Sequence, residues 1–371
     1  MSSLKTTARM AVPERPFVTG AAASGSAHSL LWTKEGKVGS FGWGHSAQLG
    51  HGDLENKLIP TPIEAEVLRG KKVIGAAAGY FHSLIWTDDG KLYSCGSWGA
   101  LGYDPYKYGD DGLSTVPRMI KGELRDKKVI GAAAGTRHSL VWTEDGEVYS
   151  FGCDGPNSLV AKAPWGILGQ GEENWHQLEP RLIKGPWVND EKKAKKVIGA
   201  AASEERSLVW TEDGQVYSFG YRGGGWPPTA SKVYIPMLME GPWRADKVIG
   251  ATAAAGHINH SLFWTEEGKV YICGWKWARE MTGLIEGPWV ADGKKVIGAA
   301  AGKLHALIWT DDGKVYSFGY VRQGQLGRGG KVPESDYDLV PTLIEGPWVK
   351  NENENKVIGA VAGENYSLVW T

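Results

Sequence analysis

Histidine, the residue most often used for acid–base catalysis and metal binding, recurs at one fixed position of a sequence motif that repeats along the chain. The positions are His28, His82, His138, His260 and His305, with Arg206 and Tyr366 at the same place in two further units. A catalytic or metal-binding histidine is needed once, or in a convergent group, whereas these are distributed one per unit. We therefore predict that they are structural and hydrogen-bond the backbone between strands.

Other sequence signatures of catalysis do not form convincing motifs. Gly223 to Gly225 is followed by Trp-Pro-Pro, which gives neither a phosphate-binding loop nor the start of a helix. No Cys/His spacing suits zinc, and no serine stands in a nucleophile elbow. We predict a protein that is not an enzyme and that holds no cofactor and no metal.

The three cysteines, Cys95, Cys153 and Cys273, are too few for a disulfide framework. We predict buried free thiols in a reducing compartment, either cytoplasmic or nuclear. No apolar run approaches the roughly 18 residues that would cross a bilayer, so no membrane insertion is expected. Lys+Arg 41 against Asp+Glu 42 leaves a formal charge of −1, which argues against general binding to nucleic acid.

The secondary-structure elements that position these residues are predicted from one sequence motif that repeats along the chain. In one unit the motif is Val73 to Gly79, then His82 to Thr87, then Lys91 to Gly96. Its Trp-Thr landmark falls at Trp32, Trp86, Trp142, Trp210, Trp264, Trp309 and Trp370. Short runs rich in Val, Ile, Tyr and Trp alternate with Gly-containing turns, and no stretch shows a sustained helical period. The protein is therefore predicted to be all-β and built of seven units.

Four strands can be placed in each unit. The Val-Ile-Gly-Ala-Ala-Ala run has small side chains where strands crowd, as expected nearest a central axis. The His-Ser-Leu-Val-Trp-Thr run and the Val-Tyr-Ser-Phe-Gly run are joined by acidic-Gly turns such as Asp89-Gly90, a strong hairpin signal. The last strand contains Pro, as at Pro117, and belongs on an outer edge because Pro lacks a donor. Seven such four-stranded antiparallel units in a ring make a seven-bladed β-propeller.

These motifs resemble the regulator of chromosome condensation repeat. The resemblance is carried by the Gly-x-x-His-Ser-Leu motif, the hairpin motif that follows it, and Gln-Leu-Gly-x-Gly at Gln48 to Gly52 and Gln325 to Gly329. It covers nearly the whole chain and implies the propeller fold. The family serves as exchange factor, photoreceptor, enzyme inhibitor and scaffold, so the resemblance does not by itself select a function.

The last unit departs from the pattern, because Trp370 is followed by Thr371 alone and the third and fourth strands are missing. In the resembled family both termini usually close the ring, so Met10 to Phe17 is expected to supply an outer strand of the last blade. A clipped natural C-terminus is the alternative. The predicted organisation is a segment at 1–16, followed by one propeller domain of seven repeats at 17–371.

Alternation of strand direction sorts the loops onto two faces. The acidic-Gly hairpins share one face, where their acids lie beside the lysines that open the first strands, and we predict a solvated ring of mutually compensating charges. The other face carries irregular aromatic loops of the kind that form interaction hot spots. The candidate partner-binding residues are Trp43, Tyr80, Phe81, Trp98, Tyr106, Arg137, Trp165, Trp175, Trp226, Trp275 and Trp277.

The sequence thus predicts a scaffold or subunit that is monomeric by itself and binds a protein partner through the aromatic face. The sharpest version that the resemblance implies is a guanine-nucleotide exchange factor for a small GTPase, and a larger complex is the other kind of partner. The alternative is a sugar-binding propeller, in which Trp226, Trp275 or Trp277 stacks on pyranose rings. A UV-B photoreceptor is disfavoured, because the positions that match the sensing tryptophans of that relative hold other residues, Tyr80, Thr136 and Glu204 among them.

Overall fold

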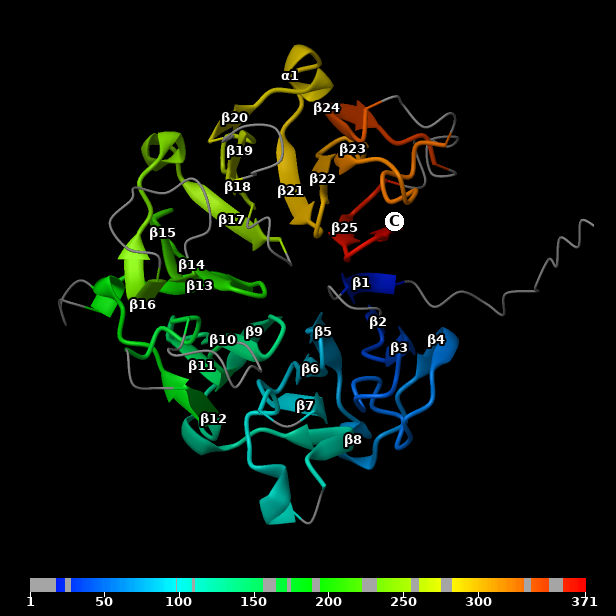
Figure 1. Ribbon diagram of the computed structural model, residues 1–371, viewed down its shortest axis with the longest axis vertical. Helices are drawn as coiled ribbons and strands as arrows, with labels where there is room; N and C mark the ends of the chain where they lie inside the picture. Colours follow the sequence, from blue (N-terminus) through cyan, green and yellow to red (C-terminus); the bar gives the residue numbers. More distant parts are fainter. Residues whose placement is uncertain are drawn as a thin grey trace, which may run out of the picture.

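The chain folds into a ring of small antiparallel sheets around a central axis (Figure 1). The computed structural model describes residues 18–23, 28–97, 99–108, 111–155, 165–171, 175–188, 194–221, 232–254, 260–274, 282–329, 335–346 and 356–371. In each four-stranded sheet the strands pair in chain order, so the first strand is innermost and the fourth outermost. The prediction of an all-β propeller is confirmed.

The first three blades are β1–β4 (Val18–Ala23, His28–Thr33, Val38–Gly42, Lys57–Pro62), β5–β8 (Val73–Ala78, His82–Thr87, Leu92–Ser97, Leu113–Met119) and β9–β12 (Val129–Ala134, His138–Thr143, Val148–Cys153, His176–Leu182). The next three are β13–β16 (Val197–Ala202, Arg206–Thr211, Val216–Tyr221, Lys232–Leu238), β17–β20 (Val248–Ala253, Ser261–Thr265, Val270–Cys273, Gly283–Ile285) and β21–β24 (Val296–Ala301, His305–Thr310, Val315–Tyr320, Tyr337–Leu343). Loops between strands also contain short helical turns, at Glu66–Leu68, Pro105–Tyr108, Gly122–Leu124, Pro186–Val188, Pro242–Ala245 and α1 (Pro288–Ala291).

The predicted count of seven blades is wrong. The described residues form six four-stranded blades, and the remaining pair of strands, β25 (Gly359–Ala362) and β26 (Ser367–Trp370), forms a two-stranded sheet. The count followed the seven Trp-Thr landmarks, which mark second strands, whereas a full blade also needs a hairpin and an outer strand. The strand β1 pairs with β2 of its own blade and contacts β25 and β26. The expected closing strand at Met10 to Phe17 lies outside the described residues.

The glycine of each first strand is explained by the tryptophan of the second. Gly75 is the register partner of Trp86, and a Cβ built on Gly75 would lie 2.1 Å from a carbon of that indole ring. Gly131 and Trp142 repeat the same contact at 2.1 Å. The half-buried indole of Trp86 also packs on the apolar cluster shared with the next blade. Trp86 is therefore a wedge between two neighbouring blades.

The acidic-Gly hairpins connect consecutive blades as well as consecutive strands. Gly90 takes φ +77°, a left-handed conformation that favours glycine, and its carbonyl accepts a hydrogen bond from the Val129 amide of the next blade at 3.0 Å. A Cβ at Gly90 would also lie 2.8 Å from the Cα of Lys128. Each hairpin therefore rests on the first residues of the following inner strand, which fixes the spacing between blades.

The tryptophans of the Gly-Pro-Trp connectors between blades are buried against neighbouring side chains. Trp187, Trp243 and Trp289 are each at most 3% exposed. The ring centroids of Trp187 and Tyr217 lie 5.0 Å apart, with the edge of one ring toward the face of the other. These three tryptophans are therefore packing spacers, and Trp348 lies outside the described residues.

The recurring histidines link neighbouring blades through side chains. His28 Nε2 lies 2.9 Å from Ser83 Oγ, and Ser83 in turn donates to the carbonyl of Gln48 at 2.7 Å. The same link joins His82 to Ser139, His138 to Ser207 and His305 to Ser367, at 2.8, 2.8 and 2.9 Å. The structural role is confirmed, but for these four histidines the partner is a serine on the next sheet instead of the predicted backbone group, whereas His260 hydrogen-bonds the backbone at His305.

The two-stranded sheet contacts the first blade through a tyrosine at the histidine position. The Tyr366 hydroxyl donates to the His28 carbonyl at 3.0 Å and lies 3.2 Å from Ser29 Oγ. This phenol joins the last described sheet to β2. All three cysteines are buried and free, as predicted.

Candidate functional site

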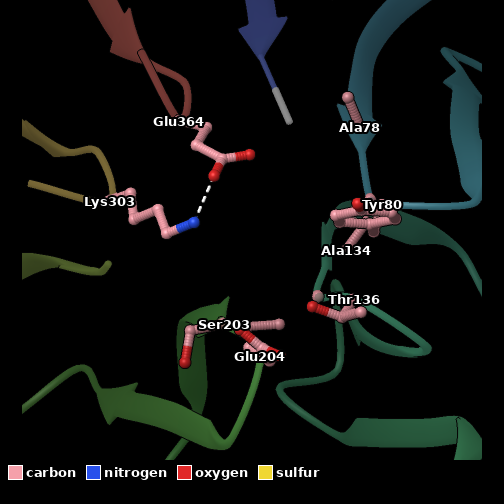
Figure 2. Close-up of a pocket in the computed structure, with 11 residues that line it drawn as sticks. Ala78, Tyr80, Ala134, Thr136, Ser203, Glu204, Lys303 and Glu364 are labelled. Atoms are coloured by element: carbon pink, nitrogen blue, oxygen red, sulfur yellow. Dashed lines mark hydrogen bonds and ion pairs between the residues drawn. The ribbon is translucent and has the colours of Figure 1, made fainter. Parts of the chain in front are cut away.

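The turns between first and second strands converge at the axis on one face of the ring. The turns at 79–81 and 135–137 are tied together, because the Tyr80 amide donates to the Gly135 carbonyl at 3.2 Å. Likewise the Lys303 amide donates to the Gly363 carbonyl at 3.3 Å. The middle residues of these four turns, together with that of the turn at 203–205, surround a common opening of about 60 Å³, the axial mouth (Figure 2).

The axial mouth is polar and carries both signs of charge. Its rim includes Tyr80, Thr136, Glu204, Lys303 and Glu364, which come from five different turns (Figure 2). The Lys303 ammonium forms an ion pair with the Glu364 carboxylate. The carboxylate of Glu204 enters from another turn and adds an acidic group to the rim.

A second cavity, of about 280 Å³, continues from the mouth toward the third blade. It shares Tyr80, Thr136 and Glu204 with the mouth, and its further lining includes Arg137 and Trp165. We call it the Tyr80–Trp165 pocket. Because the two hollows share these residues, they lie side by side on this face.

One wall of the Tyr80–Trp165 pocket is aromatic. The rings of Tyr80 and Phe81 lie 4.5 Å apart and are tilted by 56°. The Arg137 guanidinium carbon lies 5.2 Å from the Phe81 ring centroid, within the range of a cation–π contact. This contact holds a half-buried cation against the apolar wall.

Trp165 is positioned by a buried carboxylate that the sequence analysis did not single out. Asp154 is 2% exposed and accepts hydrogen bonds from the Trp165 amide at 2.7 Å and from the Gly166 amide at 2.8 Å. Burial raises the pKa of Asp154 to about 6, while these amide donors favour the ionised form. Asp154 follows β11 directly, but the amides that donate hydrogen bonds to it lie 11 and 12 residues further along the chain. No local sequence pattern predicts contacts over this separation.

The Cys153 thiol also lines this pocket without being a nucleophile. Burial raises its pKa to about 11, so the thiol stays protonated near neutral pH. Among the described residues no three His, Cys, Asp or Glu side chains gather as a metal site. The described helices include none that is long and apolar enough to cross a membrane.

The structure brings together four of the predicted partner-binding residues and separates others. Tyr80, Phe81, Arg137 and Trp165 all line the Tyr80–Trp165 pocket. Three more predicted residues are not among those that line this pocket. Trp43 is half-buried with its ring 5.7 Å from that of His45, and Tyr106 is 62% exposed in the turn Pro105–Tyr108. The Trp175 carbonyl accepts a hydrogen bond from the Asp154 amide. Trp98, Trp226, Trp275 and Trp277 lie outside the described residues. Lys303 and Glu364 were missed, although both occupy the same turn position as Tyr80.

Comparison with known proteins identifies the family. The family model described as "RCC1-like domain" matches residues 3–369 of this chain. The chain belongs to the RCC1-like domain family. This RCC1-like propeller is 36% identical over 202 residues to the human E3 ubiquitin-protein ligase HERC2, which is 53% of this chain and 4% of HERC2.

Solved structures with the same fold cover almost the entire chain. Human WBSCR16 matches with a TM-score of 0.77 and 21% identity, over 95% of this chain and 86% of that one. Prp20p from Saccharomyces cerevisiae matches with a TM-score of 0.74 and 21% identity, over 95% of this chain and 82% of that one. At this level of identity the likeness concerns the fold.

The hairpin face of the RCC1-like propeller presents charges that largely compensate one another. Lys71 pairs with Asp89 and Lys195 with Asp213, while the Lys128 ammonium lies 2.6 Å from the Glu144 carboxylate. The predicted ring of compensating charges is confirmed for these pairs. Exposed pairs of this kind each contribute less than about 1 kcal/mol to stability.

Proposed function

We propose that this RCC1-like propeller is a non-enzymatic binding protein that holds a protein partner on the face of the axial mouth. The observation that carries the proposal is the Tyr80–Trp165 pocket. It combines an aromatic wall, a half-buried guanidinium and an open cavity of about 280 Å³. Aromatic residues and arginine, placed in a concave and partly desolvated site, are the usual anchors of protein interfaces.

The charge distribution on the two faces supports this choice of face. On the hairpin face, lysines such as Lys71 and Lys195 are already paired with acids of the neighbouring turns. A partner that binds this face would replace these ion pairs with new exposed ion pairs. The exchange would contribute little binding free energy, because each exposed pair is weak. The pocket face offers aromatic surface and the Arg137 guanidinium, for which no ion pair is found among the described residues.

Nucleotide exchange on a small GTPase is the finer form of the proposal. The structure of Prp20p is described together with its binding properties to Gsp1p and histones, and Prp20p shares the fold of this chain. The assay is release of a fluorescent GDP analogue from Ran-type GTPases in the presence of catalytic amounts of the propeller. Faster release supports exchange activity, and an unchanged release rate across a panel of GTPases reduces the proposal to partner binding alone.

The choice of face is tested on the partner that affinity capture from native extract identifies. Tyr80→Ala and Trp165→Ala should each weaken binding by roughly 2 kcal/mol, about thirtyfold, if these rings are hot spots. The matched control is the charge reversal Asp88→Lys with Asp89→Lys on the hairpin face, which should change the affinity little. Loss of binding in the control, with both aromatic variants unaffected, would show that the hairpin face is the site. The sugar-binding alternative rests on tryptophans outside the described residues and stays a prediction.

A further inference from the structure

We infer that the Tyr80–Trp165 pocket takes a peptide segment of the partner that carries one acidic and one basic side chain beside an apolar one. This inference rests on the proposed function and specifies the chemistry of the partner. The pocket is lined by two opposite charges, Arg137 and Glu204, that do not form an ion pair with each other. Two charges of opposite sign in one cavity, neither of them in an ion pair among the described residues, match a ligand with the complementary pair.

Arg137 is positioned to recognise a carboxylate. It stands in the turn between β9 and β10 with its guanidinium over the Phe81 ring, which restricts its orientation. No carboxylate of the described residues forms an ion pair with it. A guanidinium presents a planar fork of donors that matches the two oxygens of a carboxylate, so an Asp or Glu of the partner is the fitting group.

Glu204 is positioned to recognise a cation. It is half-buried in the turn between β13 and β14, and no hydrogen bond or ion pair to its carboxylate is found among the described residues. The contrast is Glu364 on the rim of the same mouth, whose charge is already paired with Lys303 (Figure 2). Partial burial makes an unpaired carboxylate costly, so a Lys or Arg of the partner gains more here than on an exposed rim.

The shape of the two hollows favours a stretch of chain as their occupant. The pocket and the axial mouth share Tyr80, Thr136 and Glu204, so the two hollows lie side by side and together reach from the third blade to the axis. The lining of the pocket also includes the aromatic residues Tyr80, Phe81 and Trp165, which can take an apolar side chain. An extended peptide presents charged and apolar side chains along such a length, whereas a compact ligand would occupy one end.

The test is selection of phage-displayed random nine-residue peptides on immobilised wild-type protein, Arg137→Gln and Glu204→Gln. The wild type should enrich peptides with an acidic and a basic residue at constant spacing around an apolar one. Arg137→Gln should lose the preference for the acidic residue and keep that for the basic one, and Glu204→Gln should do the reverse. A synthetic peptide from the wild-type selection should bind each variant roughly tenfold more weakly, the size of one charge-assisted contact.

A charge exchange separates recognition from a general loss of binding. The double variant Arg137→Glu with Glu204→Arg should select peptides in which the acidic and basic positions are exchanged. Thermal melting confirms that each variant is folded before it is used. The hairpin variant Asp88→Lys with Asp89→Lys should select the same peptides as the wild type.

Two results would overturn the inference: wild-type selection without the charged pair, or the same peptides on wild type and on both single variants. The proposed function fails separately. If Tyr80→Ala and Trp165→Ala abolish binding of the captured partner while the charge variants select unchanged peptides, the face is correct and the peptide chemistry is wrong. If the aromatic variants bind the captured partner normally and the hairpin variant does not, the proposed function itself is wrong.

Discussion

Acid should unfold this propeller well before its surface carboxylates are protonated, because its buried histidines can exist only in the neutral form. Ser83, Ser207 and Ser367 each donate their hydroxyl proton to a backbone carbonyl, so each Oγ must accept from the Nε2–H of the histidine on the preceding blade. A second proton would then have to reside on Nδ1. Of these histidines, His138 has a buried Nδ1 with no hydrogen-bond partner among the described residues. The Nδ1 of His82, whose Nε2 lies against Ser139 Oγ, is buried without a partner in the same way.

The cost of protonation follows from burial. Desolvation lowers the pKa of His28, His82, His138 and His260 to about 3, and that of His305 to about 4. In the unfolded chain these imidazoles bind a proton below about pH 6.5. The unfolded state therefore holds more protons than the folded state between these limits, and stability is lost as the pH falls through the window from about 6.5 to about 3.

The expected loss is large compared with the stability of a typical domain. Lowering the pH from 7 to 5 costs about 2 kcal/mol for each histidine and roughly 9 kcal/mol for the five. Asp154 acts in the opposite direction, because its raised pKa lets the folded state bind a proton first, and it offsets roughly 1 kcal/mol of this loss. The remainder is comparable with the usual total stability of about 5–15 kcal/mol.

The assay is urea unfolding at pH 7, 6 and 5, with the wild type compared with His82→Gln. We expect the free energy of unfolding to fall steeply with pH, and the fall between pH 7 and 5 to be smaller by about 2 kcal/mol in the variant. Comparing the two slopes cancels any constant destabilisation by the substitution. The matched control is His45→Gln, which replaces an exposed histidine and should keep the wild-type slope. A wild-type stability that is equal at pH 7 and 5, or a His82→Gln slope equal to that of the wild type, would refute the reasoning.

Two further predictions concern packing and the pocket. Gly199→Ala should lower the free energy of unfolding by about 1–3 kcal/mol, because the new Cβ would lie 2.1 Å from the Trp210 ring, whereas Gly283→Ala, with no atom within 4 Å of its Cβ, should change it by less than about 0.5 kcal/mol. If Gly199→Ala and Gly283→Ala lowered the free energy of unfolding in urea by the same amount, the contact between the inner-strand glycine and the tryptophan ring would not be the reason for the glycine. Asp154→Asn should lower the free energy of unfolding by about 1–3 kcal/mol and also weaken partner binding, because its NH2 group would replace the oxygen that accepts from the Gly166 amide, next to Trp165. Normal affinity in a titration calorimeter would show that Trp165 is held by other contacts.

The sequence by itself determined the local structure of each unit. The acidic-Gly turns predicted the hairpins, and the positive φ of Gly90 confirms the reason. The small residues of the Val-Ile-Gly-Ala run predicted the innermost strands, and the Pro-containing runs predicted the outer ones, as in β8. These features depend on residues close together in the chain, where propensity and turn chemistry act, so they could be predicted without coordinates.

Tertiary structure decided which units are complete and which side chains meet. The landmark Trp370 counts as a seventh unit in the sequence, yet it belongs to a two-stranded sheet, because a blade is defined by strand pairing and a landmark marks one strand. The contact of Arg137 with Phe81 joins two neighbouring blades. The hydrogen bond from the Trp165 amide to Asp154 joins two distant residues of one long loop. Such contacts depend on the spacing of blades around the axis, which is set by packing between units, so a pattern read within one unit cannot predict them.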